Sequence, residues 1–262
     1  MASGTAPRTM LSSEPLQELL ALTKDADSVE LKLTVPESDQ HSTVRALGLD
    51  ALESEIRQVF FFETPELTLD KSGLVVRARR SQKKGDDTVV KLRPVVPAQL
   101  PGALRRSPSF NVEVDVGTEG YVCSGSMKGV ARTGAVQETF RGGRPTRKLF
   151  SKEQRDLFDK HAPEGVGLDD LLMLGPIFVL KLKTSPEGLN RRLVTELWLY
   201  PDGTRILELS TKCLPQEAFN VAAETRAFLS SKGVNLGSEQ QTKTRTALEY
   251  FADNLEEATA KA

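Results

Sequence analysis

The chain has 262 residues, of which 39% are hydrophobic, 27% charged and 6% aromatic. This suits one large domain with a sizeable core. The formal net charge of −1 gives no electrostatic reason to expect a nucleic-acid partner, and no run of 18 apolar residues could span a membrane. The first residues lack the apolar segment of a signal peptide, and Cys123 and Cys213 have neither zinc-site nor disulfide spacing. We therefore expect a soluble, cytoplasmic protein with reduced thiols.

Alternation of apolar and polar residues predicts the strands in the first half of the chain. Residues 28–35, which read SVELKLTV, show it most clearly. Further strands are predicted at residues 58–65, 74–80, 88–94 and 110–116. The helical spacing of Val44, Leu47, Leu52 and Ile56 predicts a helix over residues 42–57. The Gly-, Ser-, Thr- and Arg-rich residues 117–147 carry no periodic signal, so no element is predicted there.

In the second half, Ser151 and Gln154 have the spacing of a capping box and predict a helix over 151–161. Three strands follow at residues 177–184, 193–200 and 204–212. Two helices are predicted at residues 215–233 and 238–254. We expect a flexible N-terminal tail over 1–27, a single domain over 28–253 and a short tail over 254–262.

Ionisable residues recur two apart on these strands, so they share one face of each strand. The sets are Glu30/Lys32, Arg77/Arg79, Lys91/Arg93, Glu113/Asp115, Lys181/Lys183, Glu196 alone, and Glu208 with Lys212. For any one strand, an ordinary antiparallel sheet with its charged face in water explains the pattern. Seven such strands favour a mostly β (α+β) fold: a closed antiparallel β-barrel with helices packed outside and its charged faces turned inward.

A lumen rich in Lys and Arg suits a chain of phosphates, because Arg and Lys donate charge-assisted hydrogen bonds to phosphate oxygens. Carboxylates in the same lumen favour Mg²⁺ or Mn²⁺, which prefer oxygen ligands. His41 and His161, the two histidines of the chain, are interpreted as surface residues. The pattern therefore predicts a polyphosphate site with a divalent metal.

The residues resemble the CYTH, or triphosphate tunnel, superfamily, which includes class IV adenylate cyclases and thiamine triphosphatases. Ser28–Lys32 (SVELK) stands where that family has an E-x-E-x-K strand. The segment FFFETPELTLDKSGLVVRAR is similar to its aromatic strand, D-T-P-x-L turn, glycine and L-R-x-R strand. Gly203–Glu208 resembles the start of its terminal G-x-F-x-E-x-E motif. Four positions depart from the pattern: Ser28, Asn111, Ser210 and Lys212.

The resemblance implies a cationic phosphate clamp and a carboxylate metal site. The implied phosphate-binding residues are Lys32, Arg77, Arg79, Lys91, Arg93, Lys181 and Lys183. Glu30 and Glu208 are the first candidates for metal ligands, with Glu113, Asp115 and Glu196 as further candidates. The catalytic residue is unknown, and Lys32 is one candidate for it. Because Ser28 and Ser210 replace acidic residues of the family pattern, the metal-binding side is thinner than the phosphate clamp.

What the resemblance implies about function is the hydrolysis of a triphosphate compound, either inorganic tripolyphosphate or an organic triphosphate, with Mg²⁺ or Mn²⁺. Two alternatives stay open. A binding module of the same fold would hold polyphosphate or a nucleotide with little turnover, and a class IV-type adenylate cyclase would cyclise ATP. The expected partner is a triphosphate or polyphosphate small molecule, with neither a membrane nor a specific nucleic acid. A homodimer is left open.

Overall fold

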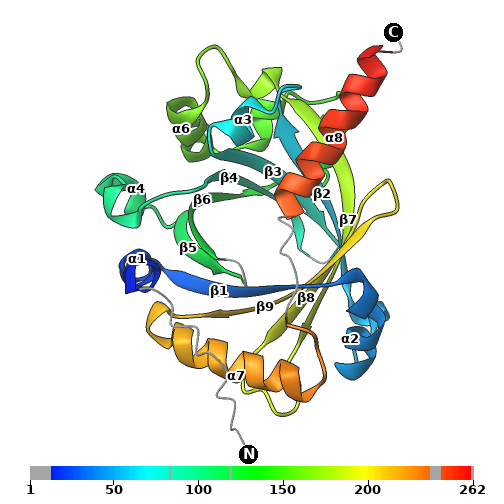
Figure 1. Ribbon diagram of the computed structural model, residues 1–262. Coiled ribbons are helices and arrows are strands. Elements are labelled where there is room, and N and C mark those ends of the chain that lie inside the picture. Colours follow the sequence, from blue (N-terminus) through cyan, green and yellow to red (C-terminus); the bar gives the residue numbers. More distant parts are fainter. Residues whose placement is uncertain (1–12, 83, 118–119, 237–242, 261–262) are drawn as a thin grey trace, which may run out of the picture.

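The computed structural model describes residues 13–82, 84–117, 120–236 and 243–260. Within these residues, nine strands close into a barrel. The strands are β1 (Ser28–Val35), β2 (Glu55–Glu63), β3 (Leu74–Ser81), β4 (Gly85–Leu92), β5 (Phe110–Val116), β6 (Tyr121–Ala131), β7 (Leu172–Thr184), β8 (Leu193–Leu199) and β9 (Arg205–Cys213). Figure 1 shows them around one central space, with the helices outside most of the wall.

The order around the barrel is β1-β5-β6-β4-β3-β2-β7-β8-β9, and β9 returns to β1. Neighbouring strands are antiparallel except for β1 and β5, which pair in parallel with Ser28 opposite Glu113. The predicted mostly β, α+β barrel is therefore confirmed, with this one parallel pair as a difference from a purely antiparallel wall. The parallel pair brings the acidic ends of two strands, Glu30 and Asp115, directly opposite each other.

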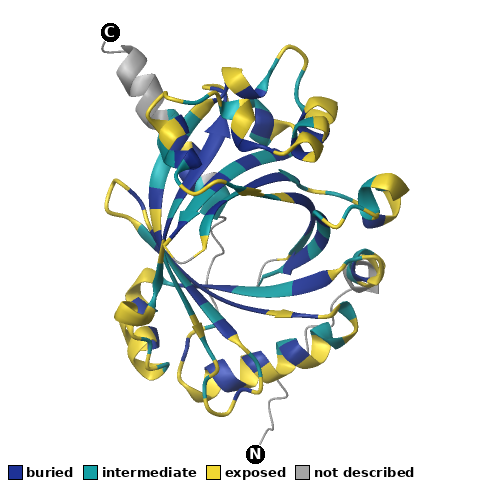
Figure 2. Cartoon of the chain, turned by 180° about the vertical axis from the view of Figure 1, so that it is seen from behind, coloured by how far each residue is buried: buried dark blue, intermediate teal, exposed yellow. Residues whose placement is uncertain are grey.

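Apolar side chains on the outer faces of the strands pack under the helices. Phe62 on β2, Val76 on β3 and Val112 on β5 belong to one buried cluster, which also includes Phe158 of α6. On the far side, Leu209 of β9 packs with Phe228 of α7. Figure 2 shows the same division, with buried residues on the barrel wall and exposed residues on the outer surfaces of the helices. Because directly opposite residues of paired strands point to one face, the charged residues between these apolar ones point inward.

The helices decorate this barrel in chain order. They are α1 (Ser13–Lys24), α2 (Gln40–Ala46), α3 (Thr68–Lys71), α4 (Gly102–Arg105), α5 (Ala135–Phe140), α6 (Lys152–His161), α7 (Ala218–Ser231) and α8 (Lys243–Ala260). Within the described part of the chain, no helix is long and apolar enough to cross a membrane. The capping box predicted for α6 is confirmed, with Ser151 and Gln154 bonded to each other's backbone N–H groups.

Two segments differ from the prediction. Residues 13–24, expected to lie in a tail, form α1, because Leu19 and Leu22 pack against the main outer cluster. The helix expected over residues 42–57 ends at Ala46, since Gly48 adopts a left-handed conformation (φ +60°) that stops the helix. β2 then begins at Glu55, three residues before the predicted strand start.

Gly73 sits at the turn into β3 and controls the position of Arg93. Its φ is +71°, and an added Cβ would lie 2.8 Å from the Arg93 carbonyl oxygen. The Gly73 carbonyl also accepts a hydrogen bond from the Arg93 N–H. We expect Gly73→Ala to lower the free energy of unfolding by about 1–2 kcal/mol from the left-handed conformation alone, with the backbone contact adding to it. Chemical denaturation measures this loss. Gly142→Ala is the matched control, because Gly142 has a similar φ of +77° and open space around it.

Candidate functional site

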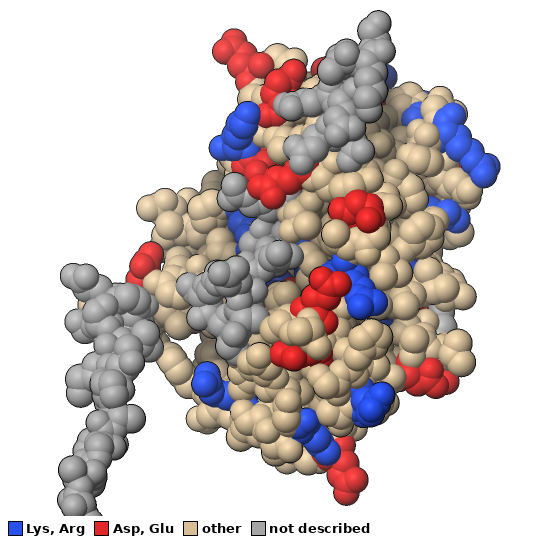
Figure 3. Space-filling view, turned by 45° about the vertical axis from the view of Figure 1, so that its right-hand side comes forward, with Lys and Arg blue, Asp and Glu red and all other residues tan. Residues whose placement is uncertain are grey.

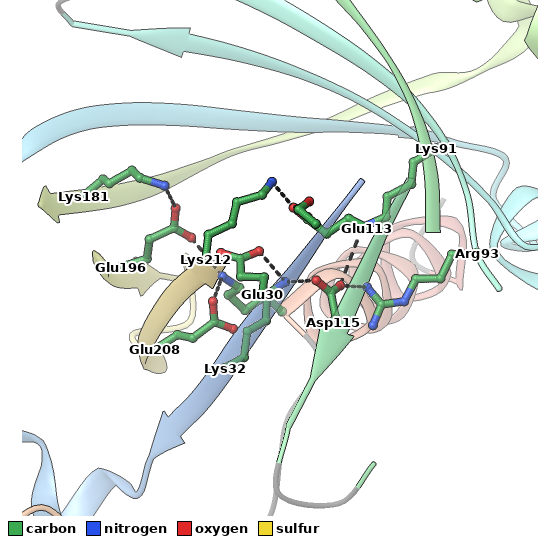
Figure 4. A network of polar contacts seen from close by, with 12 residues as sticks. Glu30, Lys32, Lys91, Arg93, Glu113, Asp115, Lys181, Glu196, Glu208 and Lys212 are labelled. Atoms are coloured by element: carbon green, nitrogen blue, oxygen red, sulfur yellow. Dashed lines mark hydrogen bonds and ion pairs between the residues drawn. The ribbon is translucent and has the colours of Figure 1, made fainter. Parts of the chain in front are cut away.

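The strand registers place the predicted phosphate-binding and metal residues on the inward face of the barrel, which we call the lumen. Glu30 lies opposite Asp115 on one side and Lys212 on the other. Lys181 lies opposite Glu196, and Lys91 is opposite Ser126. Figure 4 shows that charged side chains from β1, β4, β5, β7, β8 and β9 meet in this space. The outer surface seen in Figure 3 carries acidic and basic side chains interspersed, with no large patch of one sign.

Asp115 is the centre of the cationic part of the lumen. Its Oδ1 lies 2.9 Å from Lys32 Nζ, and its Oδ2 lies 2.9 Å from Arg93 Nη1 and 3.8 Å from Lys91 Nζ. The side chain is only 5% exposed. Burial raises the pKa of Asp115, but Lys32, Lys91 and Arg93 outweigh that effect and lower the pKa to about 2. Asp115 is therefore an ionised carboxylate that holds three cations together.

The cations around Asp115 are themselves strongly affected by their surroundings. Burial lowers the pKa of Lys32, yet the carboxylates of Asp115, Glu30 and Glu208 raise it above its ordinary value. Burial lowers the pKa of Lys91 to about 8, with Lys32 and Arg93 adding to the shift and Asp115 opposing it. Lys91 is thus a crowded cation that a further negative charge would stabilise.

Arg77 and Arg79 on β3 form a second cationic group. Arg79 Nε donates to Asp87 Oδ1 at 2.9 Å. Among the residues that the structure describes, Arg77 forms no ion pair. Burial, and then the neighbouring Arg79, lower the pKa of Arg77 to about 10. A buried guanidinium without a counter-ion is a ready donor for an anion that enters the lumen.

Three carboxylates gather beside the cations. One oxygen each from Glu30, Glu113 and Asp115 lies within 4.8 Å of the others. These three hard oxygen donors fit Mg²⁺ or Mn²⁺, which accept protein carboxylates together with water and substrate oxygens. The group differs from the predicted Glu30–Glu208 pair, because Glu208 lies opposite Thr34, four residues along β1 from Glu30.

The same acidic group is partly neutralised by the protein itself. Lys212 Nζ contacts Glu113 Oε2, and Ser28 Oγ donates to that oxygen at 3.3 Å. Lys32 Nζ lies 3.3 Å from Glu30. Burial raises the pKa of Glu113, but the Lys212 ammonium outweighs it, so the pKa is lowered. Two residues that depart from the family pattern, Ser28 and Lys212, therefore both contact a carboxylate of the acidic group.

Glu196 and Glu208 form a separate acidic pair on β8 and β9, directly opposite each other. Lys181 Nζ lies 2.6 Å from Glu196 Oε1. Lys243 of α8 lies 2.8 Å from Glu196 Oε2 and 2.6 Å from Glu208 Oε1. Trp198 Nε1 also donates to Glu196 Oε2 at 3.2 Å, so the tryptophan contributes a polar contact as well as packing.

Several lumen residues were missed by the sequence prediction. Arg57 faces inward on β2 beside Glu55 (2.8 Å), and Lys128 lies opposite Val89 on β4. The alternation of Glu55 and Arg57 was a usable signal, but it fell inside the predicted helix. Lys128 and Lys243 had no periodic signal of their own. Lys183 follows Lys181 along β7 and is exposed, and His41 and His161 are exposed on helices outside the lumen, as expected for surface residues.

Comparison with known proteins supports the fold at low sequence identity. No family model and no curated protein matches the sequence. A proposed adenylyl cyclase from Hippeastrum that reveals a dominant triphosphatase activity superposes with a TM-score of 0.61 and 17% identity, covering 82% of this chain and 92% of that one. A proposed adenylate cyclase from Bacillus halodurans gives a TM-score of 0.57 and 13% identity over 84% of this chain and 98% of that one.

Proposed function

We propose that this chain, which has the fold of the CYTH or triphosphate tunnel superfamily, binds the triphosphate group of a small molecule in its lumen and hydrolyses it. The observation that carries the proposal is the convergence of Lys32, Lys91 and Arg93 on Asp115, with Arg77 unpaired nearby in the part of the lumen that the structure describes. A linear triphosphate carries several negative charges and many acceptor oxygens, which match such a group of donors.

Binding is an exchange of partners. A phosphate oxygen that approaches Lys91 or Arg93 competes with Asp115 for the same hydrogen bonds. Arg77 needs no such exchange, so it is the natural first contact for the ligand. Lys181 and Lys32 then bind further oxygens from opposite sides of the lumen. Fixed cations of this kind also stabilise the charge that develops as a phosphoryl group is transferred.

Hydrolysis requires a route for water as well as charge neutralisation. Glu30, Glu113 and Asp115 would hold one Mg²⁺ or Mn²⁺, which when bound neutralises phosphate charge and favours ionisation of a water. The carboxylate oxygens that remain free can accept hydrogen bonds from a water beside the terminal phosphate. Lys32, which contacts both Glu30 and Asp115, would fix the orientation of these two carboxylates.

A second candidate function is binding without turnover. Lys212 and Ser28 favour it, because both contact Glu113 and leave that carboxylate less available to a metal. The fold and the cationic group are the same under both functions. Phosphate release from tripolyphosphate, measured with and without Mg²⁺ or Mn²⁺, separates the two. Release that depends on the metal supports hydrolysis, whereas no release in any condition, combined with tight binding, supports the binding function.

The binding step has its own test. Tripolyphosphate at millimolar concentration and low salt should raise the melting temperature, because it binds only the assembled lumen. Arg77→Ala should weaken binding by about 1.5–3 kcal/mol, the worth of a charge-assisted hydrogen bond. Isothermal titration in metal-free buffer measures this loss. Arg147→Ala is the matched control, since Arg147 lies outside the barrel with a side chain 64% exposed. Equal losses in the two variants would contradict the proposed lumen site.

A further inference from the structure

The C-terminal helix α8 packs on side chains that face into the barrel. Ala247 and Leu248 of α8 are buried in one cluster with Phe61 of β2, Ile177 of β7 and Trp198 of β8. Val59 and Phe61 lie opposite Arg79 and Arg77 in the β2–β3 register, so this apolar cluster shares the inward face with the cations. Figure 1 shows α8 beside β2 and β7, with its first turn near the centre of the barrel.

Lys243, the first residue of α8, connects this apolar packing to the charged part of the lumen. Its ammonium bridges Glu196 and Glu208 at 2.8 and 2.6 Å, and lies 5.0 Å from the centre of the Trp198 ring. The Lys243 carbonyl accepts a hydrogen bond from Tyr200 Oη at 3.1 Å. The Lys243 side chain is 15% exposed. Strands β8 and β9 therefore hold both the side chain and the backbone of this one residue.

The acidic pair needs this ammonium. Glu196 and Glu208 lie directly opposite each other, and like charges at such positions repel. Both side chains are largely buried, at 15% and 8% exposure, which strengthens the repulsion. Lys181 reaches only Glu196, so Lys243 is the cation that contacts both carboxylates. Lys181 and Lys243 together balance the two negative charges.

We propose that Lys243 is a positioning residue: it is the built-in counter-ion of the Glu196–Glu208 pair and makes the docking of α8 depend on the charge of the lumen. Apolar contacts alone would hold α8 whatever the lumen contains. With Lys243 as the link, α8 is held more tightly when the lumen becomes more negative. Resting on the proposed function, it follows that a bound triphosphate tightens the docking of α8.

The test uses Trp198, the one tryptophan of the chain, as a reporter. Trp198 is 4% exposed and packs beside Ala247 and Leu248, so undocking of α8 opens it to solvent. In the full-length protein without ligand, Lys243→Met should shift the emission of Trp198 to longer wavelength and raise its acrylamide quenching constant. We expect an increase of about twofold or more, the smallest change that coupling between contacting residues produces.

Two further variants separate a charge link from packing. In a Glu196→Gln/Glu208→Gln background the anions are gone, so Lys243→Met should change the quenching constant much less than in the wild-type background. Lys232→Met is the matched control, because Lys232 also lies over an aromatic ring, Phe228 at 5.8 Å, but on α7 and exposed. It should leave the quenching of Trp198 unchanged. An equal effect of Lys243→Met in both backgrounds would overturn the proposal.

Tripolyphosphate gives the second arm. It should lower the quenching constant of Trp198 in the wild type and have a smaller effect in Lys243→Met. If titration calorimetry shows no binding of tripolyphosphate at all, the proposed function fails while the ligand-free comparison still tests the role of Lys243. If tripolyphosphate binds and quenching of the wild type does not change, the link between ligand and α8 is wrong.

Discussion

Asp115→Asn should destabilise the protein by about 3 kcal/mol and at the same time strengthen its binding of tripolyphosphate. The substitution keeps the shape of the side chain and removes the carboxylate charge that pairs with Lys32, Lys91 and Arg93. Removing one partner of a buried ion pair costs about 3–5 kcal/mol. The lower end applies because the three cations keep 20–30% exposure. For a chain of this size, a loss of this order lowers the melting temperature by about 6–12 °C.

The gain in affinity has the same origin. Without Asp115, three neighbouring cations repel one another, and a polyanion replaces the missing counter-ion. We expect tripolyphosphate to bind about tenfold more tightly in metal-free buffer, which corresponds to about 1.4 kcal/mol. Asp87→Asn is the matched control, since Asp87 pairs with the single cation Arg79 and is 28% exposed. It should cost about 1 kcal/mol or less. Weaker binding by Asp115→Asn would show that Asp115 orients the cations and does not compete for them.

Glu30→Gln should reduce the affinity for Mn²⁺ at least 100-fold and remove metal-dependent hydrolysis, while tripolyphosphate still binds. Glu30 supplies one of the three grouped carboxylates, and even outer-shell substitutions cost about 10–100-fold in metal affinity. Titration with Mn²⁺ alone measures the metal site without reference to turnover. Glu55→Gln is the matched control, because Glu55 faces the same lumen but pairs with Arg57. Unchanged Mn²⁺ affinity in Glu30→Gln would rule out this site.

The same titration can be run in the opposite direction. Lys212 lies opposite Glu30 and contacts Glu113, whereas Ser210 lies opposite Lys32. Lys212→Glu therefore adds a carboxylate beside the acidic group and removes the competing ammonium. We expect tighter binding of Mn²⁺ than in the wild type. Lys212→Met, which only removes the charge, should fall between the two. If all three proteins bind Mn²⁺ equally, Lys212 does not compete with the metal.

The barrel could be predicted from the sequence wherever burial affects one face of a strand and charge the other. Residues 28–35, 74–80 and 110–116 are strands in the structure because their outer Val and Leu side chains lie under helices while Glu30, Arg77 and Asp115 point inward. β6 escaped prediction because its inward Ser124 and Ser126, and the glycines between its outer residues, leave no contrast between the faces. Small residues carry little hydrophobic signal.

The site was only partly predictable for a related reason. Strand alternation indicates which residues share a face, but not which strands become neighbours. The grouping of Glu30 with Glu113 and Asp115 depends on the parallel pairing of β1 with β5, two segments far apart in the chain. The contact of Lys243 with Glu196 and Glu208 depends on where a C-terminal helix docks. Both are tertiary choices, and no local pattern specifies them.

The hold of Asp115 on three cations also has a consequence for the fate of products. A triphosphate presents enough negative charge to take Lys32, Lys91 and Arg93 away from this carboxylate. Cleavage divides that charge between two smaller anions, each with fewer oxygens to offer. Asp115 remains beside the cations throughout and competes with each fragment for them. The lumen thus favours longer phosphate chains over orthophosphate, and its own carboxylate promotes the departure of the spent fragments.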